Sequence, residues 1–221
     1  MAVGEAKLKA DPELVALWVR GWALARETAP PTPHADGHRV EVGWPNQARR
    51  FVFPTLSDEI RRLGSGVDEP FVFLKACAPP EALRGVLDEP WSVADPSYMM
   101  TLADLDRPTP LAPLGYQLEI QAGPSGPIAV VTSSGDIAAS GRVAVVGDLA
   151  VYDRIVTDPD HQRRGLGAVV MAALGRAARD LGARRGALVA TEAGRGLYES
   201  LGWRLHSLYA TAVILGPAPG H

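Results

Sequence analysis

The sequence predicts an α/β protein, α+β in organisation, in which helices flank a sheet. Residues 116–156 favour consecutive strands, because apolar and polar positions alternate there. Residues 165–181 carry apolar side chains at helical spacing, and shorter strand and helix patterns recur on either side. An apolar content of 47% in 221 residues is enough to bury a core, so a globular protein is expected.

The first hundred residues predict the order αββαβα. Asp11, Pro12 and Glu13 combine a capping side chain, a proline in the first turn and an acid near the positive helix end, so a helix begins there. Residues 38–42 and 50–53 alternate like the strands of a hairpin. The other predicted elements of this half are a helix closed by Gly64, a strand and a second short helix, at residues 57–63, 71–74 and 80–87.

The second half begins after a proline-rich stretch. Pro108, Pro110 and Pro113 cannot donate backbone hydrogen bonds and favour extended chain, so the halves are expected to be residues 1–107 and 108–221. The predicted strands of the second half lie near residues 116–121, 128–132, 137–146, 148–156, 187–190, 203–206 and 210–215. Its predicted helices are 165–181, which Gly182 ends, and 193–201.

Composition and charge exclude several functions. The formal net charge of -3 lacks the basic surplus of nucleic-acid-binding domains, so no nucleic-acid partner is expected. No apolar run is long enough to span a bilayer, so no membrane association is expected. Cys77 is the only cysteine and no zinc-ligand spacing occurs, which favours a cytoplasmic setting and no bound metal. A homodimer is compatible with this composition.

The strongest chemical signal is a loop between a strand and the helix that starts at Gly165. Free backbone N–H groups at a helix start, worth about half a positive charge, suit an anionic diphosphate. Gly165 and Gly167 let the backbone approach phosphate oxygens, and Arg163 or Arg164 can add charge-assisted bonds. These arginines could instead point to solvent or bind a ribose 3′-phosphate.

Other site types match less well. A nucleoside-triphosphate loop requires lysine and then Ser or Thr after its last glycine, but Ala168 and Val169 follow Gly167. A dinucleotide fingerprint requires glycine or alanine where Val170 stands, which disfavours a Rossmann fold. Neither a Gly-x-Ser-x-Gly elbow nor a His-Glu-x-x-His helix occurs, which disfavours a serine or metal hydrolase.

Residues 155–167 resemble the acetyl-CoA-binding motif of the GNAT acetyltransferase superfamily. The family pattern Gln/Arg-x-x-Gly-x-Gly/Ala falls on Gln162, Gly165 and Gly167, and residues 197–203 resemble the family's later helix and the turn after it. The resemblance covers about residues 116–215. It implies a central mixed, mostly antiparallel sheet with a splayed strand pair, plus an N-terminal α/β half that is a degenerate GNAT-like copy or an acceptor-side elaboration.

The resemblance implies an N-acetyltransferase that uses acetyl-CoA as co-substrate and a small-molecule or peptide amine as acceptor. Tyr198 stands where the family often has a tyrosine, and is the expected general acid for the leaving thiolate. Thr191 stands near a segment where family members often have asparagine, and is expected to cap the following helix. The expected cofactor-binding residues are Ile155, Val156, Thr157, Gln162, Arg163, Arg164, Gly165, Leu166, Gly167, Ala168 and Thr191.

Two questions stay open in the sequence. The general base is not identified, and Glu119, Asp153, His161 and Glu192 are the candidates. A second function class also fits, namely a catalytically idle fold that binds acyl-CoA or a protein partner. Four tryptophans of the first half could line the acceptor side of a cleft: Trp18, Trp22, Trp44 and Trp91.

Overall fold

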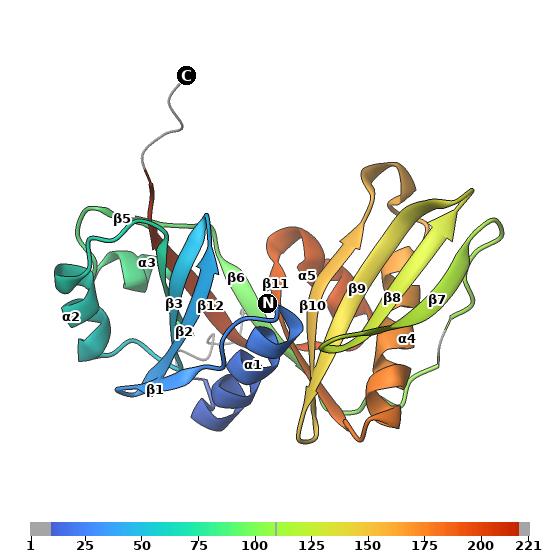
Figure 1. The fold of residues 1–221 in the computed structure, drawn as a ribbon, viewed down its shortest axis with the longest axis horizontal. Coiled ribbons are helices and arrows are strands. Elements are labelled where there is room, and N and C mark those ends of the chain that lie inside the picture. Colours follow the sequence, from blue (N-terminus) through green and yellow to red (C-terminus); the bar gives the residue numbers. More distant parts are fainter. Residues whose placement is uncertain (1–9, 109, 217–221) are drawn as a thin grey trace, which may run out of the picture.

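The computed structural model describes residues 10–108 and 110–216, which form one twelve-stranded sheet with helices packed on it (Figure 1). The elements in chain order are α1 (Pro12–Ala25), β1 (Thr32–His34), β2 (Gly37–Trp44), β3 (Gln47–Phe53), α2 (Asp58–Gly66), β4 (Val72–Ala76), α3 (Pro80–Arg84), β5 (Trp91–Val93), β6 (Ser97–Leu102), β7 (Gln117–Gly123), β8 (Gly126–Ser133), β9 (Asp136–Val146), β10 (Leu149–Thr157), the 3₁₀ turn η1 (Pro159–His161), α4 (Leu166–Asp180), β11 (Arg185–Thr191), α5 (Glu192–Ser200) and β12 (Arg204–Ile214).

The sheet is mixed and mostly antiparallel, as the family resemblance implies. Its strand order is β1-β2-β3-β4-β12-β6-β11-β10-β9-β8-β7, with β5 paired to β12 beside this path. Among the described strands, only β3–β4 and β10–β11 pair in parallel. Strands β12 and β6 join an N-terminal lobe, made of β1–β5 with α2 and α3, to a C-terminal lobe, made of β7–β11 with α4 and α5 (Figure 1).

Helix α1 lies between the two lobes (Figure 1). Asp11 caps it by accepting a hydrogen bond from the Glu13 backbone N–H at 2.9 Å, which confirms the predicted helix start. Its buried face, which includes Trp18 and Trp22, packs on β9 and β10 of one lobe and on β2 and β3 of the other. The first helix of the chain is therefore part of the core of the second half, and the division at residue 107 stays a prediction.

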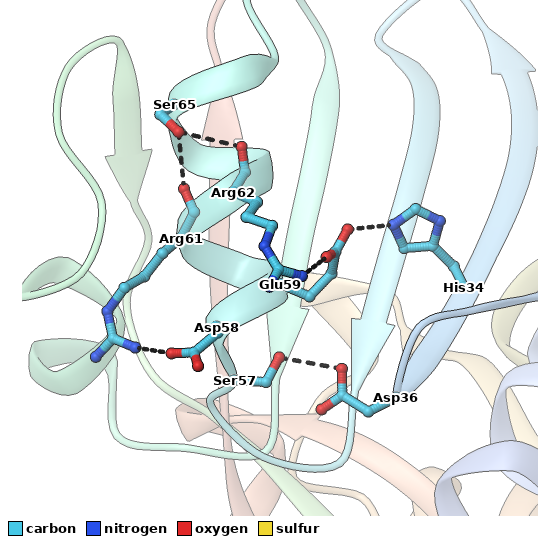
Figure 2. Close-up of polar contacts among 8 residues, drawn as sticks. All are labelled: His34, Asp36, Ser57, Asp58, Glu59, Arg61, Arg62 and Ser65. Atoms are coloured by element: carbon cyan, nitrogen blue, oxygen red, sulfur yellow. Dashed lines mark hydrogen bonds and ion pairs between the residues drawn. The ribbon is translucent and has the colours of Figure 1, made fainter.

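Helix α2 is attached to the neighbouring strands by polar contacts that Figure 2 shows. The Glu59 carboxylate lies 2.9 Å from His34 Nε2 and accepts a hydrogen bond from Arg62 at 3.0 Å. The contact with His34 is partly buried, whereas Arg62 is exposed, and a pair with an exposed partner contributes about 1 kcal/mol at most. The fully buried Ile60 on the inner face of α2 therefore contributes more to the attachment.

Some predicted elements differ from the structure at their ends. Helix α2 continues through Gly64, because that residue serves close packing: a Cβ there would lie 2.6 Å from Leu87 Cδ2. Helix α3 is shorter than predicted and ends at Arg84. The two strands predicted at 203–206 and 210–215 are one strand, β12, with an irregular register between Leu205 and Ser207.

Three strands lie outside the predicted elements. Strands β1 and β5 have three residues each, too few for an alternating pattern to show. Strand β6 does not alternate because it is a central strand whose consecutive residues Tyr98, Met99 and Met100 are all buried. In the part of the chain that the structure describes, no helix is long and apolar enough to cross a membrane, and no cluster of metal-ligating side chains occurs.

Candidate active site

The site begins where two parallel strands separate. Strands β10 and β11 pair only through residues 149–151 and 185–187, although both continue beyond them. The register of β10 against β9 shifts between Asp153 and Val156, and Arg154 there has a φ of 51°. This bulge bends β10 away from β11. The splayed strand pair implied by the family resemblance is therefore present.

A cavity of about 310 Å³ lies in the gap between the splayed strands. Helix α5 contributes Tyr198 to its wall, and α1, which packs on the other face of the sheet, contributes Trp18, Trp22 and Arg26. The cavity is therefore lined from both faces of the sheet. The remaining lining residues come from β3, β4, β10, β11, α5 and β12: Arg50, Lys75, Tyr152, Asp153, Arg154, Ile155, Leu188, Val189, Ala190, Thr191, Gly194 and Tyr209.

The loop before α4 presents unpaired backbone donors. Among the described residues, the N–H groups of residues 163–167 have no hydrogen-bond partner, and the first amides bonded back are those of Ala168 and Val169, to the Gly165 carbonyl. Gly165 is the N-cap with a φ of 81°, a conformation that favours glycine. Five consecutive amides at the positive end of a fifteen-residue helix suit a doubly anionic group.

The two arginines of this loop differ in their contacts. Arg164 donates to the Tyr116 hydroxyl at 2.9 Å and to the Asp160 carbonyl at 3.1 Å, so it braces the loop. The Tyr116 hydroxyl also lies 2.9 Å from His161 Nδ1. Arg163 is exposed, and its guanidinium has no partner among the described residues. Arg163 is therefore the side chain of the pair that remains available to a ligand.

The two glycines of the loop serve different purposes. No atom lies within 4 Å of a Cβ placed on Gly165, so the need there is for positive φ. A Cβ on Gly167 would lie 2.7 Å from Leu197 Cδ2, so this glycine allows α4 to pack against α5. The sequence prediction assigned both to phosphate approach, and close helix packing is an additional reason for Gly167.

The other expected cofactor-binding residues lie along β10 and at both helix starts. Ile155 and Thr191 line the cavity, and Thr191 caps α5 by accepting from the Gly194 N–H at 3.2 Å, as predicted. The Thr157 carbonyl accepts a hydrogen bond from Gln162 Nε2 at 3.4 Å. The rest are Val156, which is exposed, Leu166, whose side chain is buried, and Ala168, which is half-buried; their roles toward a cofactor stay predictions.

Tyr198 is 8% exposed and faces the cavity from α5. Burial, together with the nearby charge of Asp153, raises the pKa of its phenol to about 12. The phenol therefore stays protonated at neutral pH and can donate a hydrogen bond. Its role as an acid stays a prediction.

Of the four candidate bases, only Asp153 lines the cavity. Arg26 holds both of its oxygens, from Nε and Nη2, at 2.8 Å each. The Glu192 carboxylate accepts a hydrogen bond from the Tyr98 hydroxyl instead. The other two lie elsewhere: His161 is in the loop before α4, and Glu119 is on β7.

Two basic residues of the cavity, Arg50 and Lys75, were not expected from the sequence. Arg50 is 6% exposed and lies 3.5 Å above the Trp22 ring, and burial lowers its pKa to about 10. Lys75 donates to Thr211 Oγ1 at 2.9 Å, and burial, followed by the charges of Arg50 and Arg26, lowers its pKa well below the usual value. The sequence did contain one sign of this feature, because Lys75 stands inside the otherwise apolar strand β4.

Part of the second half of the chain matches a known protein family. Residues 124–205 match the family described as "Acetyltransferase (GNAT) domain". No curated protein matches the chain in sequence. A GCN5-related N-acetyltransferase from Kribbella flavida superposes with a TM-score of 0.68 at 14% identity, covering 98% of each chain.

Two further solved structures share the fold over nearly the whole chain. A putative GNAT-family acetyltransferase from Novosphingobium aromaticivorans has a TM-score of 0.57 at 18% identity, covering 92% of this chain and 99% of that one. A tandem GNAT protein from the clavulanic acid biosynthesis pathway has a TM-score of 0.53 at 16% identity, covering 95% and 97%. The shared fold thus extends well beyond residues 124–205 into the N-terminal lobe.

Proposed function

Because this chain carries a GNAT acetyltransferase domain, we propose that it transfers an acetyl group from acetyl-CoA to a primary amine. One observation carries the proposal: the cavity between the splayed strands and the unpaired amides before α4 both lie against α5. Leu197 of α5 touches Gly167 in the first turn of α4, and its neighbour Tyr198 lines the cavity. One extended ligand could therefore occupy the loop and the cavity together.

The residues present fit the diphosphate of acetyl-CoA at the loop. The amides of residues 163–167 and the free guanidinium of Arg163 would bind its oxygens. The unpaired inner edges of β10 and β11 would accept the pantetheine arm, with backbone groups of Ile155 and Thr157 on one side. Bound there, acetyl-CoA supplies the thioester, and the protein supplies orientation and charge.

The reaction proposed is direct attack of a neutral amine on the thioester carbon. A C–N bond forms, the oxyanion accepts a hydrogen bond from a backbone N–H of the β10 bulge, and the C–S bond then breaks. Tyr198 gives its proton to the departing thiolate, which makes the neutral phenol the required form. The proton lost by the amine leaves through water or Asp153.

Asp153 is suited to hold the acceptor nitrogen. Both of its oxygens accept from Arg26, but each carboxylate oxygen retains a further lone pair. An ammonium group bound to Asp153 would enter the cavity that Tyr198 also faces. Asp153 therefore positions the amine before its deprotonation.

The N-terminal lobe is proposed to be a degenerate copy of the same unit. Its β3–α2–β4 crossover repeats the parallel β10–α4–β11 arrangement of the C-terminal lobe (Figure 1). The link between β3 and α2, residues 54–57, contains no glycine, and β3 and β4 pair over residues 49–53 and 72–76 without a splay. This copy has therefore lost the features of a cofactor site and contributes acceptor-side residues instead.

Calorimetric binding of acetyl-CoA tests the function. Gly165→Glu and Gly165→Lys introduce the same backbone strain but opposite charges beside the loop amides. We expect Glu to weaken binding at least about tenfold relative to Lys, since a charged contact is worth about 1.5–3 kcal/mol. Equal affinity of both variants and wild type would remove the loop assignment. Tight binding without thioester turnover on an amine panel would identify an idle acyl-CoA-binding fold.

A further inference from the structure

Four of the residues that line the cavity carry hydrogen-bond donors and lie in or against the N-terminal lobe. Arg50 comes from β3, Lys75 from β4, Trp18 from α1 and Tyr209 from β12. These four residues, here called the basic end, are far apart in the sequence. Pairing of β3 with β4 and of β4 with β12, and the passage of α1 between the lobes, bring them to one cavity.

No carboxylate in the described part of the chain forms an ion pair with Arg50. It is 6% exposed, and no carboxylate among the described residues lies within ion-pair distance of its guanidinium, although the charge of Asp153 acts on it from farther away. The guanidinium lies 3.5 Å from the centre of the Trp22 ring, and with the side-chain amide of Gln47 oriented oxygen-first it donates to that oxygen at 2.9 Å. A buried guanidinium without a contacting counter-ion is unfavourable, so an anion that entered the cavity would be stabilised by Arg50.

Two further donors of the basic end are unsatisfied. Trp18 Nε1 and the Tyr209 hydroxyl are buried, and neither has a hydrogen-bond partner among the described residues. The two rings contact each other edge to face, with their centroids 5.4 Å apart. Buried polar atoms in native proteins nearly always have partners, and exceptions call for an explanation. Lys75 adds protons that its bond to Thr211 leaves free.

The charge of the whole cavity is also positive. Its lining holds four basic side chains, Arg26, Arg50, Lys75 and Arg154, and one acidic side chain, Asp153. Asp153 is already paired with Arg26. An acceptor that carries only an ammonium group would meet net repulsion there, whereas an acceptor that also carries an anion would be attracted.

We infer that the acceptor is a small amine that also bears a carboxylate, bound through that carboxylate by Arg50, Lys75, Trp18 and Tyr209, with its amino group at Asp153 and Tyr198. The inference rests on the proposed acetyl transfer and names its substrate class. The cavity has a volume of about 310 Å³ and must also admit the thioester end of acetyl-CoA, so the space left for the acceptor suits a free amino acid better than a folded protein surface. A carboxylate has only acceptor atoms, which matches a lining of donors.

The test compares matched acceptors that differ only in the anionic group: an amino acid, its carboxamide, and the amine without the carboxyl group. For wild type we expect kcat/KM to be at least about tenfold higher for the amino acid, since sites built to bond a polar group reject analogues that lack it. Arg50→Gln should lower kcat/KM at least about tenfold for the amino acid and leave the carboxamide nearly unchanged. Equal use of the three acceptors, or preference for the uncharged ones, would overturn the inference.

A second variant guards against misfolding, because Arg50 packs on Trp22. Tyr209→Phe removes only a hydroxyl that has no partner in the protein. It should raise KM for the amino acid about three- to tenfold with an unchanged acetyl-CoA dissociation constant. If wild type fails to bind acetyl-CoA, the proposed function fails. If it binds acetyl-CoA and acetylates only amines without an anion, the substrate inference alone fails. If no amine is acetylated, the affinities of the amino acid and of its carboxamide are measured by calorimetry with CoA present. Equal affinities, or no binding of either compound, would overturn the inference.

Discussion

The ion pair between Arg26 and Asp153 joins α1 to the bulged strand β10 across 127 positions of the chain. Two hydrogen bonds of 2.8 Å form it, and the side chains are 24% and 10% exposed. Breaking a fully buried pair costs about 3–5 kcal/mol, and the partial exposure of Arg26 reduces the loss expected for Asp153→Asn to about 2–3 kcal/mol. The pair should therefore be a major tether of α1 to the C-terminal lobe.

A double-mutant cycle measures this tether directly. Asp153→Asn, Arg26→Met and the double variant would be unfolded in urea and followed by the fluorescence of the buried Trp18 and Trp22. We expect a coupling energy of about 2 kcal/mol, well above the additivity error of about 0.5 kcal/mol. The two single losses should therefore not sum to the loss of the double variant.

The control is the exposed pair Arg61–Asp58 on α2, which Figure 2 shows. It has a similar bond length, 2.7 Å, but its side chains are 61% and 82% exposed. Exposed pairs couple by about 0.5 kcal/mol or less in a helix. Equal coupling in the two cycles would refute the argument that burial of the Arg26–Asp153 pair makes it strong.

Three further outcomes are expected. Tyr198→Phe should lower kcat about a hundredfold or more. Burial raises the pKa of Tyr198 to about 12, so loss of the phenol proton should not lower the wild-type rate between about pH 7 and pH 10. A fall in the wild-type rate near pH 10 that is missing in Tyr198→Phe would contradict this. Gly165→Ala should lower the free energy of unfolding in urea by about 1–2 kcal/mol, because the φ of Gly165 is 81°. Gly196 lies in helix α5 with no atom near the place of a Cβ, so Gly196→Ala should raise the free energy of unfolding by about 0.5–1 kcal/mol. Equal effects of the two substitutions would contradict the argument from backbone conformation. The hydrogen bond from Arg62, followed by the contact with His34, lowers the pKa of Glu59 below its usual value of 4.5. Glu59→Gln should therefore be less stable than wild type at neutral pH, and this difference in unfolding free energy should shrink as pH falls through the pKa of Glu59 in the folded protein. A difference of the same size in acid would contradict the pairing.

The sequence predicts the loop before α4 and the elements around it well, because their signals are local. A glycine at positive φ, a strand before it and an apolar period after it lie within consecutive residues, and α4 begins at Leu166, one residue after the predicted start. The cap of α5 by Thr191 is equally local. The ends of helices were less predictable where tertiary packing determines them. Gly64 was expected to end α2, but it lies within the helix and allows close packing against Leu87.

The acceptor side was not predictable in the same way. Arg50, Lys75 and Tyr209 are distant in sequence, and only the sheet order places them beside α1. The four base candidates were equivalent as sequence positions, and the fold distinguishes Asp153 because the β10 bulge places it in the cavity. Non-local pairing therefore determines the features that we propose select the substrate.

A crystal structure with coenzyme A at saturating concentration would show whether the loop before α4 binds the cofactor. We expect diphosphate oxygens within hydrogen-bond distance of the amides of residues 163–167, and the pantetheine arm between β10 and β11. Ligand density at another place on the molecule, or coenzyme A bound with those amides still unpaired, would contradict this expectation.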